Sequence, residues 1–320
     1  MVIGYTSGLV TPPIYEDWTH PMEHTRRSSP ALALLLTAVL LVALGTLAAP
    51  ATADAAAQWA DSAEASITPG VQMLTEGGQC TANFIFTDGD DVLIGYSAHC
   101  AGTGGSTSTN GCEAGTLPTG TEVEIEGASQ PGTLAYSSWE TMQERGESDS
   151  NTCMYNDFAL VAIHPDDHDA VNPTIPFWGG PDGIGDTTGS LDKVYTYGNS
   201  SLRLGIDLLS PKEGYSLGQN GDGWNHPVYT VTPGIPGDSG SAVLDASGQA
   251  VGSLSTLALA PLAGSNGVTD LALALDYANQ HGGMDAELAE GTERFGGGLV
   301  LPDLTADVTS SSVSVSISLW

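Results

Sequence analysis

Short runs of strand-forming residues, separated by turn residues, constrain the fold of this chain more than any other feature. The runs are rich in Val, Ile, Leu, Thr and Tyr, and Gly, Asn, Asp and Pro bound them. Such runs are typical of β-strands, and their repetition with frequent turns favours a sandwich or a barrel. They fall into two sets on either side of a glycine-rich connector at 177–190. The first set is 81–86, 92–97, 122–126, 133–137 and 158–163, and the second is 193–197, 204–209, 228–232, 242–244 and 250–254. The sequence therefore predicts an all-β protein.

One segment has helical spacing instead. Val268, Leu271, Ala272 and Leu275 recur at i, i+3, i+4 and i+7, and glycines follow at 282–283. This pattern predicts an amphipathic helix over about 268–281 that packs its apolar stripe on the second set of strands. After Phe295 the chain continues as a C-terminal tail, 296–320. Its end alternates polar and apolar residues, and the sequence does not decide between a docked strand and a disordered tail.

The first 53 residues indicate export. Arg26 and Arg27 precede an apolar run at 31–47 and a small-residue cleavage site at 51–53, which is typical of a signal peptide. Met22 is an alternative translation start just before the arginines. The apolar run is shorter than the ~20 residues that a membrane span needs. We therefore expect residues 1–53 to be a leader and signal peptide, residues 54–66 a short N-terminal segment, and the mature protein to be secreted without a stable membrane anchor.

The charge balance excludes two classes of partner. The 320 residues contain 7 Lys and Arg against 38 Asp and Glu, a formal net charge of -31. Nucleic acids and anionic membranes require positive surface, so neither is expected as a partner. A highly soluble exported protein, expected to be a monomer, fits this charge. A protein adapted to saline surroundings is the alternative, because counter-ions would screen the self-repulsion.

Four cysteines occur in the chain, at positions 80, 100, 112 and 153. An even number in a secreted protein favours disulfide bonds, and four cysteines allow three pairings. No two of them have the two-to-four-residue spacing of a zinc site. The residues themselves leave the choice among the three pairings open.

In the stretch Gly234–Ser241, glycines lie close to Ser239 on both sides. A serine nucleophile requires backbone N–H groups aimed at the oxyanion that develops on the attacked carbonyl. Gly237 and Ser239 are the candidates for these two donors, because glycine lets the main chain turn its amide toward the site. The alternative is an ordinary polar turn, since Gly, Asp and Ser are common turn residues.

Two further stretches support the catalytic interpretation. Ala98-His99-Cys100 follows one apolar run and Asp157-Phe158-Ala159-Leu160 opens another, so the order along the chain is His, Asp, Ser. This order is that of chymotrypsin and differs from those of subtilisin and the α/β-hydrolases. Together with 237–241, these blocks resemble the signature motifs of trypsin-like serine peptidases. The stretches 79–84, 197–203 and 266–271 resemble members of the secreted actinobacterial branch.

The resemblance covers about 67–295 and implies the fold of this domain. It implies two six-stranded antiparallel β-barrels, the first at about 70–175 and the second at about 190–262, followed by the C-terminal helix. It also implies that Ser239 is the nucleophile, His99 the general base and Asp157 the partner of His99. The alternatives are a turn serine, a core histidine beside a disulfide, and a carboxylate that caps a strand end.

The resemblance further implies two structural features. A disulfide is expected beside the catalytic histidine, Cys80 with Cys100, which leaves Cys112 with Cys153. Asp238, next to the nucleophile, is expected to be buried and to need a positive partner. No Lys or Arg occurs between Asp54 and Cys80, so a cut after a basic residue cannot create that partner. Arg203 is the first candidate and Lys193 the second, and a solvated Asp238 is the alternative.

The expected specificity pocket carries no charge. Pro233 lies six residues before the nucleophile, where trypsin-like relatives that cut after Arg or Lys have a carboxylate. Gly234 and the segment Ser255-Thr256-Leu257 are expected to form the walls of the pocket. An arginine in such a pocket would lose water without gaining an ion partner. We therefore expect cleavage after small or medium apolar residues.

No cofactor or metal is expected. His164, Asp166, Asp167 and His168 form the one metal-like cluster, but Pro165 prevents a regular helical face, and a solvated loop is the better interpretation. The leading hypothesis is a secreted serine endopeptidase that acts on proteins or peptides. The alternatives are a catalytically silent binding or adhesion module and an esterase that uses the same three residues.

Overall fold

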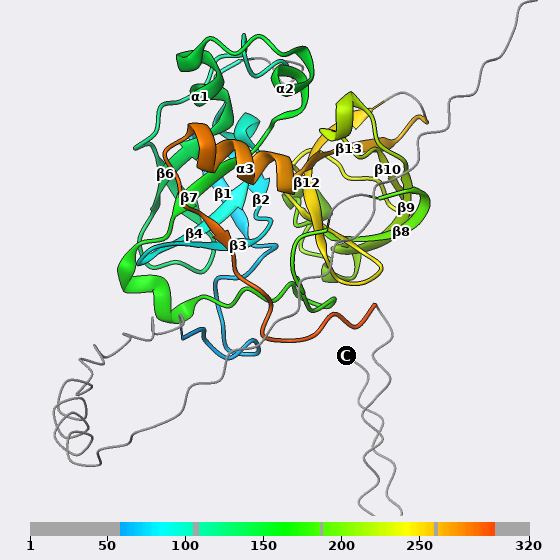
Figure 1. Ribbon diagram of the computed structural model, residues 1–320. Helices are drawn as coiled ribbons and strands as arrows, with labels where there is room; N and C mark the ends of the chain where they lie inside the picture. Colours follow the sequence, from blue (N-terminus) through cyan, green and yellow to red (C-terminus); the bar gives the residue numbers. More distant parts are fainter. Residues whose placement is uncertain (1–57, 105–108, 186–187, 259–261, 298–320) are drawn as a thin grey trace, which may run out of the picture. The chain divides into compact units, whose positions relative to one another are not determined.

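The computed structural model describes residues 58–104, 109–185, 188–258 and 262–297 (Figure 1). The chain divides into two units, Met1–Ala56 and Ala57–Trp320, and the described residues belong to the second. The expected leader at 1–53 lies outside the described residues, as does the tail from residue 298 onward. In the part of the chain that the structure describes, no helix is both long and apolar enough to cross a membrane.

Seven strands from the first half of the described chain and the late strand β14 form an open, antiparallel sheet of eight strands. In spatial order the strands are β14 (Glu287–Leu288), β3 (Ile85–Asp88), β4 (Asp91–Tyr96), β7 (Ala159–Ala162), β6 (Gly132–Ser137), β5 (Glu122–Ile125), β1 (Gln72–Thr75) and β2 (Gly78–Thr81). Alternating residues of β1 and β5 are buried, as in strands with one covered face, whereas β4 and β7 are buried along nearly their whole length. The catalytic candidates His99 and Asp157 stand at the ends of the neighbouring strands β4 and β7.

The strand pairing does not show the closed first barrel that was expected. The chain bends between β2 and β3, where the side chain of Asn83 accepts the backbone N–H of Phe84 at 2.7 Å. After the bend β3 pairs with β4 on one side and with β14 on the other, with Glu287 opposite Thr87. β14 thus forms one edge of the sheet. The backbone between β2 and β3 continues both ladders, with the N–H of Ala82 donating to the carbonyl of Val71 at 2.9 Å and the N–H of Asn83 donating to that of Gly95 at 2.8 Å. No pattern in the sequence predicted β14, which is a two-residue strand.

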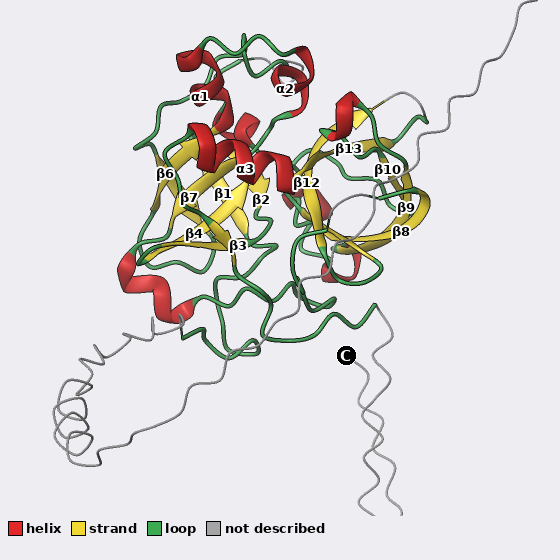
Figure 2. Ribbon diagram, in the orientation of Figure 1, coloured by secondary structure: helices red, strands yellow, loops and turns green. Residues whose placement is uncertain are grey.

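The second half forms the closed six-stranded barrel that was expected (Figure 2). Its strands, in order around the barrel, are β10 (Val228–Thr230), β13 (Ser265–Asp270), β12 (Ala250–Ala258), β11 (Ala242–Asp245), β8 (Ser190–Tyr197) and β9 (Pro211–Leu217). A cluster of buried valines fills its centre, namely Val194, Val228, Val243, Val251 and Val268. The barrel therefore extends to residue 270 rather than to about 262.

One expected strand of this barrel, 204–209, is wrong. Leu204 has a left-handed backbone, and two short 3₁₀ turns, Ser201–Arg203 and Asp207–Leu209, occupy this part of the chain. The strand begins later, at Pro211, and buries Lys212, Gly214 and Ser216 in alternation. The apolar residues at 204–209 led to the incorrect prediction of a strand there. The strand in the structure instead directs polar residues and glycine to the interior.

Within the described ranges, three α-helices accompany the strands: α1 (Ser138–Arg145), α2 (Ser150–Tyr155) and α3 (Leu271–His281). Helix α3 was expected, but it begins three residues late because the side chain of Asp270 caps it, accepting the N–H of Leu273 at 2.8 Å. Val268 consequently belongs to β13. Helices α1 and α2 were not expected, since they are short and their sequences are mostly polar.

Candidate active site

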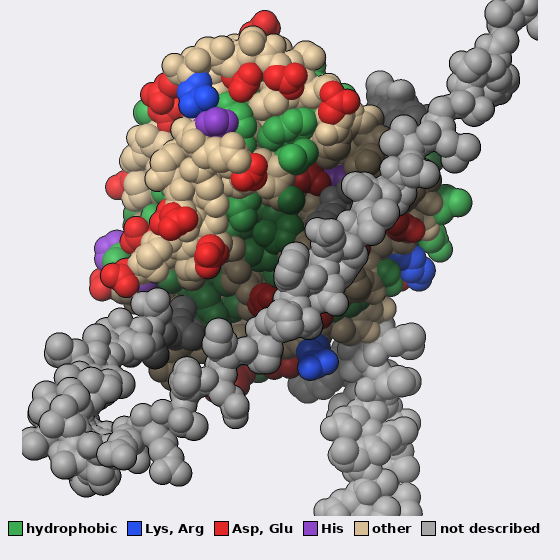
Figure 3. Space-filling model, viewed as in Figure 1, with side chains coloured by type: hydrophobic (Ala, Val, Ile, Leu, Met, Phe, Trp, Pro, Cys, Tyr) green, Lys and Arg blue, Asp and Glu red, His purple; other side chains and the backbone are tan. Residues whose placement is uncertain are grey.

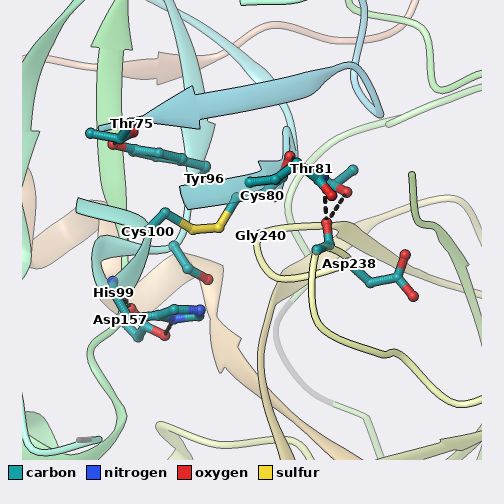
Figure 4. The surroundings of a disulfide bond; sticks show 12 residues. Thr75, Cys80, Thr81, Tyr96, His99, Cys100, Asp157, Asp238 and Gly240 are labelled. Carbon is teal, nitrogen blue, oxygen red and sulfur yellow. Dashed lines mark hydrogen bonds and ion pairs between the residues drawn. A yellow bond between two sulfur atoms is a disulfide. The ribbon is translucent and has the colours of Figure 1, made fainter. Parts of the chain in front are cut away.

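His99 lies in a 3₁₀ turn, Ala98–Ala101, directly after β4. The neighbouring Cys100 is joined to Cys80 on β2 by a disulfide bond, and the second bond joins Cys112 to Cys153. Both pairs are those that the family resemblance implied. Figure 4 shows the disulfide directly beside the imidazole of His99. The turn that carries His99 is thus tied covalently to β2, which precedes it along the chain.

Asp157 holds His99 through two hydrogen bonds. The backbone N–H of His99 donates to Oδ1 of Asp157 at 2.8 Å, and Nδ1 of the ring lies 2.7 Å from Oδ2. The Asp157 side chain is 6% exposed and that of His99 is 28% exposed. The ring nitrogen that faces Asp157 is fixed, so the opposite nitrogen, Nε2, is the one available for proton transfer.

The pair shifts the pKa of both groups. Burial opposes charging of His99, but the negative charge of Asp157 and its hydrogen bond outweigh burial and raise the pKa of His99 above 6.5. Burial likewise opposes charging of Asp157, but the interactions with His99 and Ser255 hold the pKa of Asp157 below its usual range. Asp157 therefore remains a carboxylate while His99 can accept a proton at near-neutral pH.

Ser255 has a different position from the one expected. Its hydroxyl donates to Oδ2 of Asp157 at 2.5 Å and therefore does not face the proposed pocket. Ser255 lies on β12, so this contact joins the barrel to the Asp157 that precedes β7 of the sheet. Sequence reasoning missed this role because nothing local distinguishes Ser255 from another serine on a strand.

Ser239 lies beside the segment that carries His99. The N–H of Gly240 and the hydroxyl of Ser97 both donate to one carbonyl, that of Leu254, at 2.6 and 3.1 Å. On its other side, the carbonyl of Ser239 accepts the N–H of Thr81 at 2.8 Å, next to the Cys80–Cys100 disulfide. The chain thus brings together the three segments that the sequence motifs singled out.

Within the described residues, no hydrogen bond joins the hydroxyl of Ser239 to His99. In enzymes without substrate this bond is often long, and it tightens when the substrate binds. Ser239 is half-buried, and among the described residues its hydroxyl makes no hydrogen bond.

The peptide between Pro236 and Gly237 has a fixed orientation. The carbonyl of Pro236 accepts the hydroxyl of Ser200 at 2.6 Å, and the N–H of Gly237 points the opposite way because the two groups of a trans peptide are opposed. Gly237 has φ of +97°, and an added Cβ would lie 2.8 Å from the Ser200 hydroxyl, so only glycine fits. In the described part of the chain, neither the N–H of Gly237 nor that of Ser239 meets an acceptor.

Asp238 is fully buried, and Arg203 is one of its partners. The guanidinium of Arg203 lies 2.5 Å from Oδ2 of Asp238 and also donates to the carbonyl of Pro233 at 3.2 Å. Figure 4 shows the carboxylate of Asp238 pointing away from His99. Lys193, the second candidate, pairs instead with Glu213 at 3.8 Å and has a 45% exposed side chain. The lysine that reaches Asp238 is Lys212, which sequence reasoning missed.

The expected pocket walls meet at Asn266. Its carboxamide oxygen accepts the N–H of Gly234 at 2.8 Å, while its nitrogen donates to the carbonyls of Gly234 and Thr256 at 3.3 and 3.1 Å. Pro233 is partly buried and Leu257 is 54% exposed. The buried Asn266 thus bridges the Gly234 segment and β12, a role that the sequence did not reveal because β13 was not expected.

Trp139 of α1 lies behind His99, with 6.5 Å between the ring centroids. The indole is buried and lies close to Gly102, where an added Cβ would be 3.4 Å from Cζ3 of Trp139. The sulfurs of Cys80 and Cys100 lie within 4.8 Å of a His99 ring nitrogen, but a disulfide offers no thiolate to a metal.

The other metal-like cluster is used in hydrogen bonds. Nδ1 of His164 accepts the N–H of Asp166 at 3.2 Å, and Nε2 of His168 lies 3.1 Å from the carbonyl of Ile163. The carboxylate of Asp167 accepts two backbone N–H groups, from Ser129 and Gln130. These contacts stabilise a loop, and they give the cluster a structural explanation.

No protein-family model and no curated protein matches this chain. Similar solved structures include Protease A of Thermobifida fusca (17% identity, 70% of this chain and 99% of that chain, TM-score 0.45) and a Nocardiopsis protease (17%, 69% and 98%, TM-score 0.43). Another is the chymotrypsin of Cellulomonas bogoriensis (17% identity, 67% of this chain and 96% of that chain, TM-score 0.41). Actinobacterial serine proteases, which the sequence motifs resemble, are thus among the solved structures similar to this chain.

Proposed function

We propose that this protein is a serine endopeptidase that hydrolyses peptide bonds through an acyl-enzyme. The observation that carries the proposal is the pairing of His99 with a buried, charged Asp157, at 2.7 Å, beside Ser239 and two unengaged backbone N–H groups. These are the parts that acyl transfer by a serine requires: a nucleophile, an oriented base and donors for the oxyanion.

In the proposed reaction, Nε2 of His99 takes the proton of the Ser239 hydroxyl as the oxygen attacks the carbonyl carbon of the substrate. The N–H groups of Gly237 and Ser239 hold the oxyanion that forms. When the C–N bond breaks, His99 returns its proton to the leaving amine. Water then attacks the acyl-enzyme by the same sequence of proton transfers and releases the new carboxyl group.

The contacts of Asp157 support its role in this reaction. A carboxylate that accepts the Nδ1 proton fixes the tautomer of His99 and stabilises the imidazolium that forms during attack. Asp157 accepts three hydrogen bonds, from the backbone and ring of His99 and from Ser255. We assign Ser255 the role of orienting Asp157, in place of its expected role as a pocket wall.

The proposed substrates are proteins or peptides with a small or medium apolar residue before the cut. Pro233, Gly234, Thr256 and Leu257 offer no charged side chain, and the carboxamide of Asn266 lies between the two walls. An exported protein is the proposed setting, because both disulfide bonds would persist in an oxidising compartment. A secreted monomer without cofactor or metal remains our proposal for the mature chain.

Activity on a folded or denatured protein substrate, and on matched peptide ester and peptide amide substrates, tests the proposal. We expect Ser239→Ala and His99→Ala to lower kcat by about 10⁴-fold or more, because triad members act as a unit. Ser247→Ala is the matched control, since Ser247 is an exposed turn serine on the same barrel.

Each alternative predicts its own result. Hydrolysis of the ester without hydrolysis of the amide would favour an esterase. No Ser239-dependent hydrolysis of either substrate would favour a catalytically silent binding module.

A further inference from the structure

Asp238 has a second buried positive neighbour besides Arg203. The ammonium of Lys212, on β9, lies 3.3 Å from Oδ2 of Asp238, and neither side chain is exposed to solvent. Gly198 leaves room for this contact, since an added Cβ would collide with both Lys212 Nζ and the Asp238 carboxylate. The two cations and one carboxylate give this buried cluster an excess of positive charge.

The carboxylate of Asp238 is bound on both oxygens. Oδ1 accepts the N–H of Ser200 at 3.1 Å, and Oδ2 accepts the N–H of Ile235 at 3.1 Å as well as the two cations. The N–H of Asp238 donates back to the carbonyl of Ile235 at 2.8 Å. Asp238 thus closes the turn Ile235–Asp238, which contains the Pro236–Gly237 peptide whose N–H faces the proposed oxyanion site.

Lys212 is unfavourable for stability when it is charged. Burial, together with the repulsion from Arg203, outweighs the attraction of Asp238 and lowers the pKa of Lys212 to about 8. The nearby Tyr197, whose own pKa burial raises, is neutral at this pH. Among the residues that the structure describes, the charged groups that face Lys212 are therefore Asp238 and Arg203. Local conflicts of this kind are expected where function rather than stability determines a residue.

We propose that Lys212 is a positioning residue for the oxyanion hole, a second internal counter-ion that holds Asp238 and the turn Ile235–Asp238 in the catalytic conformation. This inference rests on the proposed function. Arg203 holds Oδ2 of Asp238 through a charge-assisted hydrogen bond, so it maintains a basal active conformation. Lys212 adds to this conformation while it is protonated, and its contribution is lost when it becomes neutral.

The consequence for the wild type is a partial fall in kcat through pH ~8 to a lower plateau, with little change in KM. Lys212→Met, which lacks the ammonium, should have this lower kcat throughout the pH range. We expect Lys212→Met to reduce kcat about tenfold at pH 7, the effect of losing one hydrogen bond to a charged group. The wild type and Lys212→Met should converge above pH 9.

Stability separates this role from a merely structural one. The folded pKa of Lys212 lies below its unfolded value of 10.5, so the unfolded state binds more protons between these two values. The wild type should therefore gain stability as the pH rises from about 8 to 10.5, and Lys212→Met should lack this gain. At pH 7 we expect Lys212→Met to be as thermally stable as the wild type, although it is less active.

The experiment measures kcat, KM and the thermal midpoint of the wild type, Lys212→Met and the control Lys193→Met between pH 6.5 and 10. Lys193 is the matched control, because it is an exposed lysine on the adjacent strand β8. Lys193→Met should follow the wild-type profile. Equal kcat of Lys212→Met and the wild type at pH 7, or a tenfold difference that persists above pH 9, would overturn the inference.

A second measurement does not depend on catalysis. Hydrogen-exchange protection factors of residues 234–241, which correct for the intrinsic effect of pH, should fall in the wild type through pH ~8 and stay constant in Lys212→Met. Constant protection in both proteins would overturn the role of Lys212. If no Ser239-dependent activity is found, the proposed function fails, and this measurement still decides whether Lys212 holds the turn.

Discussion

At the scale of single residues, two buried carboxylates organise the site by different means. Asp157 is held by hydrogen bonds from His99 and Ser255, whereas Asp238 is held mainly by Arg203 and Lys212. In both cases burial opposes the charge, but the partners hold the carboxyl pKa below its usual range. Each carboxylate depends on its donors, because an unpaired buried charge is strongly unfavourable.

Removal of the Ser255 hydroxyl tests one of these donors. Ser255→Ala should lower kcat with little change in KM, because Asp157 loses a charge-assisted hydrogen bond worth about 1.5–3 kcal/mol. Steady-state kinetics on one peptide substrate measure the effect. Ser247→Ala is the control, and a kcat of Ser255→Ala equal to that of the wild type would show that Ser255 does not orient Asp157.

The raised pKa of His99 predicts the acid side of the pH profile. The base must be neutral to accept a proton, so kcat/KM should rise with pH and reach half of its maximum above pH 6.5. The same shift contributes stability that is present below pH 6.5 and is lost as the pH rises through the folded pKa of His99. A half-maximum below pH 6.5 would contradict the assignment of His99 as the base held by Asp157.

At the scale of elements, the Cys80–Cys100 bond joins β2 to the turn that carries His99. Cys80→Ser/Cys100→Ser should cost about 2–5 kcal/mol of unfolding free energy, the usual range for a native disulfide in a secreted domain. It should also lower kcat, because the His99 turn loses its covalent tie. Chemical denaturation and steady-state kinetics measure the two effects.

The second disulfide is the matched control for this prediction. Cys112→Ser/Cys153→Ser removes a bond that joins a loop to α2 and does not touch the His99 turn. Its loss should reduce stability but lower kcat less than loss of the first bond does. An equal or larger loss of kcat in Cys112→Ser/Cys153→Ser would show that the Cys80–Cys100 bond has no special role at the site.

The bridge from β13 to the pocket walls makes a prediction about specificity. Asn266→Gly removes the carboxamide that lies between Gly234 and Thr256, so larger residues before the cut should be accepted.

The wild type should cut after small or medium apolar residues and poorly after Arg or Lys, because an uncharged pocket cannot replace the lost water of a cation. Peptide libraries analysed by mass spectrometry give both preferences. Predominant cleavage after Arg or Lys would contradict the pocket assignment.

The elements also show what the sequence can predict. Alternating or continuous apolar runs predicted β4, β5, β6, β7, β8 and the core of β12, because burial of one or both sheet faces dictates those patterns. The strand at Pro211–Leu217 was missed because Lys212, Gly214 and Ser216 face inward. Lys212 can face inward because it pairs with Asp238, which lies 26 residues further along the chain.

The sequence predicted some residues of the candidate site and missed others. Short motifs singled out His99, Asp157 and Ser239, since their neighbours in the chain carry part of the signal. Ser255, Asn266 and Lys212 act through partners that are distant in sequence, and no local pattern marks them. Strand β14 was not predicted for a similar reason, because a two-residue strand has no periodicity to detect.

At the scale of the whole molecule, charge is the dominant feature. The chain has 7 Lys and Arg against 38 Asp and Glu, a net charge of -31, and two of these seven cations, Arg203 and Lys212, are buried beside Asp238. Figure 3 shows acidic side chains over much of the visible face and few basic ones. Self-repulsion of this kind destabilises a compact state, and salt screens it.

This repulsion predicts a salt dependence. Raising NaCl from about 10 mM to 0.2 M shortens the screening length from about 30 Å to less than 10 Å. The thermal midpoint at pH 7 should therefore rise over this range. Near the isoelectric point of about 4.1 the same salt series should have a smaller effect, because little net charge remains. A midpoint that is independent of salt at pH 7 would contradict this view of the surface.

The central claim is that Ser239 is a nucleophile activated by His99, and covalent labelling tests it most directly. A fluorophosphonate probe reacts only with a serine whose hydroxyl is activated and whose oxyanion donors are in place. The account predicts stoichiometric labelling of the folded wild type at Ser239, located by peptide mass spectrometry, and no labelling of Ser239→Ala or of heat-denatured protein. An unlabelled folded wild type, or a label on another residue that persists in Ser239→Ala, would contradict it.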